Sequence, residues 1–127
     1  MTLVTARVEH GIGLIELHRP ARHNSLVPDL LVDLMTAHRE VVDGGAVVGV
    51  LAAAGTTFST GGDIEAIRNA ADRVAYAGEL VGRLNEAILA IAGGPIPMVG
   101  AVHGMVTGGS LGLVLACDHV VMGDRVT

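Results

Sequence analysis

The sequence predicts an α/β protein whose strands form a largely parallel sheet. Strand-length runs rich in β-branched residues alternate with longer segments in which apolar residues recur at every third or fourth position. Half of the 127 residues are hydrophobic, yet there is one Phe, one Tyr and no Trp. The interior must therefore consist of Val, Leu, Ile, Ala and Met, a mixture that suits buried strands.

Two strand-like runs, residues 2–8 and 12–18, open the chain and predict a hairpin around His10-Gly11. Pro20 ends the second strand, because proline lacks the N–H that a sheet ladder needs. A polar loop follows, and a helix is expected from Pro28, since a first helical turn tolerates proline.

Asp43-Gly44-Gly45 ends this helix and leads into residues 46–53, a continuous apolar run. We expect a central strand there that is buried on both faces. A loop of small residues follows, and Asp63 can cap a short helix that begins at Ile64.

A longer helix is expected over residues 74–92, because its leucines and isoleucines fall on one side, and 93–97 end it. The rest of the chain predicts a strand over residues 98–102, a glycine corner at Gly108-Gly109-Ser110, a helix over 111–117 and a strand over 119–122. The chain stops just after a turn, with no closing helix. We therefore expect residues 1–127 to be the N-terminal portion of a single, longer domain.

Composition excludes several classes of function. The net charge is −5, the eight basic residues are scattered arginines, and there are almost no aromatic side chains for base stacking. We therefore expect no nucleic-acid partner. No run reaches the roughly 18 apolar residues of a membrane span, and the N-terminus lacks a signal pattern. We expect a cytoplasmic protein with no membrane partner.

Cysteine and histidine usage points away from disulfides and metals. The single cysteine, Cys117, lies within an apolar run, which predicts a buried, inert thiol. The six histidines lack the spacing of a zinc site, so no metal is expected.

Two glycine loops carry the candidate chemistry. The loop from Gly55 to Asp63 follows the predicted central strand, where α/β folds bind ligands. It is not a Walker A loop, because the chain contains no lysine, and a flexible connection is its plain alternative. In the second, Gly108 and Gly109 precede a helix, whose free N–H groups and dipole favour negative charge.

A rival interpretation attaches to the second loop. Residues 108–112 also satisfy G-x-S-x-G, the nucleophile elbow of serine hydrolases, with Ser110 as the nucleophile. That chemistry needs a base and an acid, which in the α/β-hydrolase order come later in the chain. Only His119 follows, too near in sequence to fold back over a serine at a strand end.

Three blocks together resemble a known family. Arg19-Pro20 with Asn24-Ser25-Leu26, the run FSTGGDI at 58–64, and the segment from Pro95 to Asp118 occur in the order and at the separations of the crotonase family. The chain is similar to the N-terminal half of that family, the enoyl-CoA hydratase/isomerase superfamily. The resemblance implies a ββα superhelix, here lacking its C-terminal part.

The resemblance also implies a site that binds an acyl-CoA thioester. By position, the N–H groups of Gly62 and Gly109 would be the two catalytic oxyanion donors, and Arg22 would lie near the CoA phosphates. The substrate-binding residues it implies are Arg22, Asn24, Thr60, Gly61, Gly62, Asp63, Ile64, Met105, Gly108, Gly109 and Gly112. It implies no cofactor besides the coenzyme A of the substrate, and a homotrimer or dimer of trimers for a full-length protein.

One departure from the family bears on the reaction. Gly112 stands where hydratases carry a catalytic glutamate, and the second family acid lies downstream of Thr127. Hydration uses both carboxylates, so we expect an isomerase-like reaction. The alternative from another class is a non-catalytic or truncated relative that binds CoA esters or oligomerises.

Overall fold

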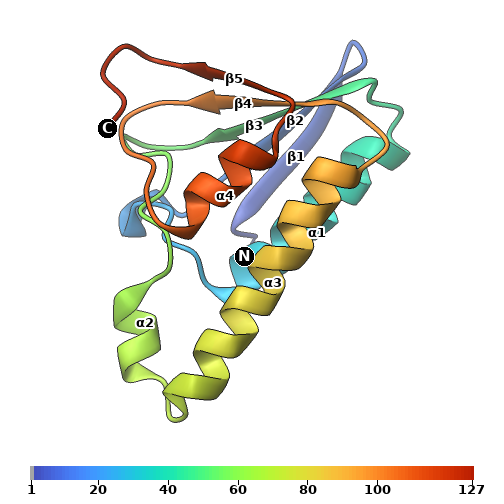
Figure 1. Cartoon of the computed structure of the whole chain (residues 1–127). Coiled ribbons are helices and arrows are strands. Elements are labelled where there is room, and N and C mark those ends of the chain that lie inside the picture. The colour runs from blue at the N-terminus through green and yellow to red at the C-terminus, as the bar shows by residue number, and fades with distance from the viewer. Residues whose placement is uncertain (1) are drawn as a thin grey trace.

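Figure 1 shows the computed structural model, which describes residues 2–127. Its elements are β1 (Val4–Glu9), β2 (Ile12–Leu17), η1 (Pro20–Arg22), α1 (Pro28–Asp43), β3 (Val48–Ala53), α2 (Ile64–Asn69), α3 (Arg73–Gly93), β4 (Met98–Val102), α4 (Gly109–Ala116) and β5 (His119–Met122). This order confirms the predicted elements except the one-turn η1, which falls where the sequence predicted a plain loop.

The five strands form one sheet in the order β1-β2-β3-β4-β5. β1 and β2 pair antiparallel through a two-residue turn in which His10 (φ 52°) and Gly11 (φ 78°) both have positive φ, as a type I′ turn requires. Every later pair is parallel, so α1, the α2–α3 segment and α4 serve as crossovers. The predicted mixed α/β fold is confirmed.

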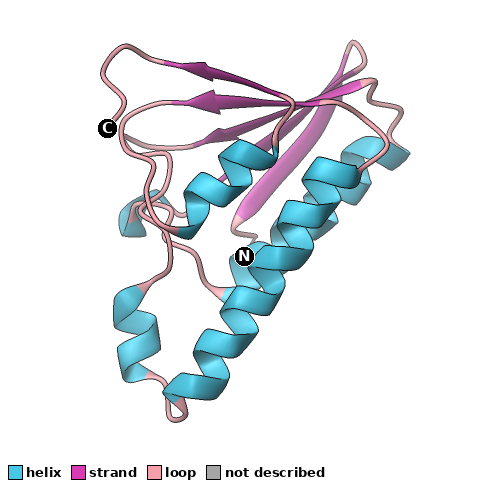
Figure 2. Ribbon diagram, viewed as in Figure 1, coloured by secondary structure: helices cyan, strands magenta, loops and turns pink. Residues whose placement is uncertain are grey.

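Helix α1 packs against β1 and β2, α3 lies alongside α1, and α4 packs beside α3, all on the same side of the sheet (Figures 1 and 2). The periodic apolar positions of α1 are buried there, as the spacing predicts. The core includes fully buried Leu30, Leu34, Leu51, Phe58, Met98 and Leu113. Within residues 2–127, no helix is both long and apolar enough to cross a bilayer.

The prediction that the central strand is buried on both faces is wrong. β3 lies between β2 and β4, but only alternate residues, such as Leu51 and Ala53, are buried, whereas Val48 and Val50 are half-exposed. Successive side chains of a strand point to opposite faces, and the helices cover only one of them. An apolar run alone does not reveal that asymmetry.

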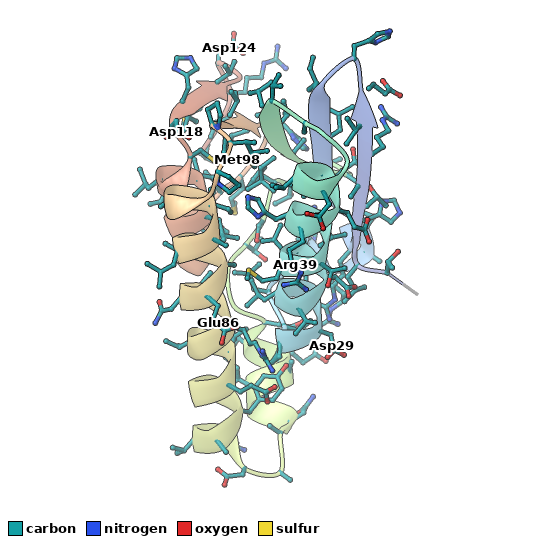
Figure 3. All side chains as sticks on the ribbon, turned by 90° about the vertical axis from the view of Figure 1, so that its right-hand side faces the viewer. Asp29, Arg39, Glu86, Met98, Asp118 and Asp124 are labelled. Carbon is teal, nitrogen blue, oxygen red and sulfur yellow. The ribbon has the colours of Figure 1, made fainter. Side chains whose placement is uncertain are left out.

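Asp118 joins the starts of the last two strands, next to Met98 in Figure 3. Its Oδ2 accepts a hydrogen bond from the Met98 N–H at 2.8 Å, and its own N–H donates to the Met98 carbonyl at 2.8 Å. The preceding Cys117 is half-buried rather than fully buried. Burial, with the nearby Asp118 charge, raises the pKa of its thiol to about 11, which fits the predicted inert thiol.

His38 on α1 is a buried base without a partner. Its side chain lies against Gly94, the residue is 6% exposed, and within the described chain its Nε2 makes no hydrogen bond. Burial, reinforced by the charge of Arg39, lowers the pKa of His38 from 6.5. The folded protein therefore keeps this ring neutral at pH values where the unfolded chain binds a proton.

We predict that the free energy of unfolding falls as pH drops below about 6.5, because the unfolded state gains the proton first. His38→Leu removes this dependence and the unsatisfied nitrogen, so it should stabilise the fold by about 1 kcal/mol at pH 6. Urea unfolding of both proteins between pH 7.5 and 5 measures the effect. Parallel pH profiles for the two proteins would contradict it.

Candidate functional site

The two glycine loops lie side by side at the carboxyl ends of β3 and β4. We call residues 55–63 the first glycine loop and residues 103–109 the second. The Ser59 N–H donates to the Met105 carbonyl at 3.1 Å, and the Thr107 N–H donates to the Ser59 carbonyl at 3.2 Å. The parallel bridge between Ser59 and Val106 marks this contact. Because β3 and β4 are adjacent and parallel, the loops that follow them lie at the same edge of the sheet, as the sequence predicts.

The segment after η1 supports the other side of the first glycine loop. The Leu26 N–H donates to the Gly61 carbonyl at 2.7 Å, and the Asp63 N–H donates to the Leu26 carbonyl at 3.0 Å. The Thr60 N–H donates to the His23 carbonyl at 3.3 Å. The first glycine loop is thus held from both sides by backbone hydrogen bonds, including two isolated parallel bridges, Leu26 to Gly62 and Ser59 to Val106.

Glycine is required at position 61 by the contact between the loops. Gly61 has φ +83°, and an added Cβ would lie 2.8 Å from the Thr107 carbonyl oxygen, 3.1 Å from the Cα of Gly108 and 3.3 Å from the nitrogen of Gly109. All three atoms belong to the backbone, so none can move aside cheaply. The missing side chain lets the two backbones approach each other.

Two backbone N–H groups at or next to this contact have no hydrogen-bond acceptor within the described chain. Among residues 2–127, neither the Gly62 N–H nor the Gly109 N–H donates a hydrogen bond. Both glycines are partly exposed, and Gly109 is the first residue of α4. Unpaired N–H groups at a helix start, with the positive end of the helix dipole, stabilise negative charge.

Asp63 lies behind this pair and is committed to the fold. Its side chain is 3% exposed, accepts hydrogen bonds from Arg19 Nη1 at 2.9 Å and Ser25 Oγ at 3.1 Å, and caps α2 through the Ala66 N–H at 2.9 Å. Burial alone would raise the pKa of this carboxyl, but the Ala66, Arg19 and Ser25 hydrogen bonds outweigh it and lower the pKa to about 2. Asp63 therefore stays ionised at neutral pH.

Arg22 lies in front of Asp63, at a surface hollow that Thr60, Gly62 and Ile64 also line. Its Nη2 is 2.8 Å from Glu65 Oε2 and 3.4 Å from Asp63 Oδ1. The Glu65 hydrogen bond and charge raise the pKa of Arg22. Arg22, which the resemblance places near the CoA phosphates, is thus half-exposed and is paired with Glu65.

The remaining predicted contact residues divide between surface and interior. Ile64 (72% exposed) and Met105 (42% exposed) reach solvent beside the loops. Asn24 is fully buried, and its side-chain polar groups are satisfied there. Its amide nitrogen donates to the Ala54 and Thr57 carbonyls, and its oxygen accepts the Arg19 N–H. These bonds tie Arg19 to the start of the first glycine loop, and a role of Asn24 in substrate binding stays a prediction.

Gly109 and Gly112 face helix α3. An added Cβ at Gly112 would lie 3.0 Å from Ile88 Cδ1, and one at Gly109 would lie 2.7 Å from Leu84 Cδ2. Gly112, which the sequence resemblance matches to a glutamate of hydratases, is therefore closely packed by α3 and has no proton-carrying group.

Ser110 has the geometry of a structural residue. It is fully buried, and its Oγ lies 2.6 Å from the Thr107 carbonyl oxygen and 3.2 Å from that of Ser59. The nearest candidate base in the second loop, His103, bonds through Nε2 to the Gly55 carbonyl at 2.7 Å. This arrangement lacks the nucleophile–base hydrogen bond that the hydrolase alternative needs.

Two residues of this site were not singled out from the sequence. In the sequence, Arg19 belongs to the Arg19-Pro20 block and Ser59 to the FSTGGDI run, and neither was assigned a role of its own. The structure pairs Arg19 with Asp63 and places Ser59 at the contact between the two loops. A polar residue inside a glycine loop was the available signal for Ser59.

The fold and site together define an α/β protein in which two strand-end loops present a pair of unpaired backbone N–H groups. The chain matches the family described as Enoyl-CoA hydratase/isomerase over residues 7–127. It belongs to that family, and its fold is that of the crotonases.

Individual relatives agree with this assignment. A protein named probable enoyl-CoA hydratase from Mycobacterium bovis is 38% identical over 104 residues, which are 82% of this chain and 40% of that protein. A 4-chlorobenzoyl coenzyme A dehalogenase from Arthrobacter is 33% identical over 125 residues, which are 94% of this chain and 45% of the relative. The chain thus spans less than half the length of these relatives.

Solved structures superpose on nearly the whole chain. An enoyl-CoA hydratase from Mycobacterium smegmatis matches with a TM-score of 0.90 at 29% identity, over 99% of this chain and 49% of that one. The human enoyl coenzyme A hydratase domain-containing protein 3 matches with a TM-score of 0.90 at 26% identity, over 98% of this chain and 49% of that one.

Proposed function

We propose that this chain carries the thioester-binding half of an acyl-CoA enzyme, with the N–H groups of Gly62 and Gly109 as an oxyanion hole. The observation that carries the proposal is the pair of unpaired amides where the two loops touch. Enolate formation places negative charge on the thioester oxygen. Fixed N–H donors favour that charged state over the neutral thioester, and one such donor is typically worth about 3–4 kcal/mol of barrier.

The surrounding residues fit the two ends of such a ligand. Arg22 and Thr60 line the hollow beside Gly62 and would receive the CoA part. Met105 and Gly108, on the opposite loop, would border the acyl part. For a full-length protein, a homotrimer or dimer of trimers belongs to the same proposal, and sedimentation would measure it.

The lack of an acid at position 112 favours isomerisation over hydration. Hydration needs one carboxylate to deliver a proton and another to activate water, but Gly112 supplies neither. Asp63, the buried carboxylate near the donors, has a pKa of about 2 and is bonded to Arg19, so it is a poor proton shuttle at neutral pH. A single acid from outside residues 1–127 would suffice for a proton shift along an enoyl chain.

The lack of a free carboxylate beside the two amides within residues 2–127 also favours a second candidate, a CoA-ester-binding protein without catalysis. Asp63 and Glu65, the carboxylates beside Gly62, are both paired with arginine. In that case the donors bind a thioester carbonyl and no proton moves.

Calorimetric titration with acetoacetyl-CoA and with acyl-free coenzyme A tests binding. We expect tighter binding of acetoacetyl-CoA, because its enolised thioester offers the charge that the two amides stabilise. Because the acid would come from outside residues 1–127, incubation of the full-length protein with a 3-enoyl-CoA separates the candidates, since conversion to the 2-enoyl isomer indicates an enzyme. No preference for acetoacetyl-CoA would contradict the oxyanion assignment.

A further inference from the structure

Three buried polar residues, which we call the column, lie in the interior beside the two glycine loops. Asn24, Ser59 and Ser110 are all fully buried and come from three separate segments. The Ser59 hydroxyl donates to the Asn24 carbonyl at 2.7 Å and accepts the Gly61 N–H at 3.2 Å. It therefore ties the first glycine loop to the segment after η1.

The Ser110 hydroxyl makes the corresponding link to the second loop. Its oxygen lies 2.6 Å from the Thr107 carbonyl oxygen and 3.2 Å from the Ser59 carbonyl oxygen. A hydroxyl has one proton, so the shorter bond to Thr107 is the main one and the Ser59 carbonyl shares it. One side chain in the first turn of α4 thus contacts carbonyls of both glycine loops.

Each hydroxyl acts one residue away from an oxyanion donor. Ser59 accepts the Gly61 N–H, whereas the next amide, that of Gly62, has no acceptor within residues 2–127. Ser110 directly follows Gly109, so the bond to Thr107 fixes the peptide that begins α4. The column therefore bears on the separation of the two amides as well as on the stability of the loops.

We propose that Ser59 and Ser110 are positioning residues of the oxyanion site, whose buried hydroxyls set the separation and direction of the Gly62 and Gly109 N–H groups. The proposal rests on the function proposed above. Neither side chain touches a substrate, since both are buried. Their effect should appear only for ligands whose oxygen both amides bind together.

The test is the affinity ratio for two ligands, measured on the chain and its variants by calorimetry. Acetoacetyl-CoA uses both amides, whereas acyl-free coenzyme A uses neither. We expect Ser110→Ala to weaken acetoacetyl-CoA about 10-fold, the loss of a little over one net hydrogen bond, and to leave coenzyme A unchanged. Ser59→Ala should behave alike. In both variants, saturating acetoacetyl-CoA should shift the Gly62 and Gly109 amide resonances less than it does in the parent chain.

A variant that only lowers global stability should leave the affinity ratio for the two ligands unchanged, and Val41→Ala provides this control. Val41→Ala removes a fully buried side chain from α1, remote from the loops, and should lower the melting temperature without changing the affinity ratio. Should Ser59→Ala fail to fold, Ser110→Ala decides alone. A folded Ser110→Ala variant that keeps the ratio overturns the positioning role and leaves the proposed function standing. A parent chain without any preference for acetoacetyl-CoA overturns both.

Discussion

Gly61→Ala is expected to abolish the thioester preference of this chain. A left-handed conformation such as φ +83° costs a residue with a Cβ roughly 1–2 kcal/mol. In addition, the new Cβ would lie 2.8 Å from the Thr107 carbonyl oxygen and close to the backbone of Gly108 and Gly109. The loops must separate to admit it, and the separation of the two amides increases with them. Acetoacetyl-CoA should bind at least about 10-fold more weakly in calorimetry.

Gly82→Ala is the matched control. Gly82 lies within α3, and no atom is within 4 Å of the Cβ that alanine would add. Helix propensity predicts a gain of roughly 0.5–1 kcal/mol in stability and no change in ligand affinity. Equal thioester affinity in the two alanine variants would rule out the need for close loop contact.

Asp63→Ala should cost about 3–5 kcal/mol of unfolding free energy, the usual result of removing one partner of a buried ion pair. The substitution leaves Arg19, whose side chain is 20% exposed, without its carboxylate and removes the cap of α2. Asp72→Ala is the control, because Asp72 caps α3 through the Ala75 N–H in the same way but is exposed and makes no ion pair with residues 2–127. Loss of a cap alone costs roughly 1 kcal/mol.

The two aspartate variants should also differ in acid. The pKa of Asp63 is 3.8 in the reference state and about 2 in the fold, so its stabilising effect is complete above about pH 4 and is lost as pH falls toward 2. The difference corresponds to about 2 kcal/mol. Denaturant unfolding of both variants and the parent chain between pH 6 and 2 measures it. If Asp63→Ala keeps the acid profile of the parent, the ion pair with Arg19 does not stabilise the fold.

Sequence patterns predicted most of the architecture because they act locally. The hairpin at His10-Gly11, the cap at Asp63 and the periodic face of α1 each depend on neighbours within a few residues. The covering of the sheet depends on where the helices pack, which is why the half-exposed face of β3 was missed.

The site shows the same division between local and long-range information. The two glycine loops could be found from their composition and their place after strands. The roles of Asn24, Ser59 and Ser110 could not, because their hydrogen bonds join residues up to 51 positions apart. The G-x-S-x-G motif predicts Ser110 as a nucleophile, whereas the structure shows its hydroxyl hydrogen-bonded to backbone carbonyls of both loops.

The paired charges beside Gly62 have a consequence for how a ligand arrives. Arg19, Arg22, Asp63 and Glu65 sum to zero, and the chain as a whole carries −5. Steering of a polyanion such as coenzyme A requires net positive charge, so these four residues supply no attractive long-range field. If coenzyme A binds as proposed, we expect its phosphate to compete with Glu65 for the Arg22 guanidinium. Selection would then depend on short-range interactions with the two amides.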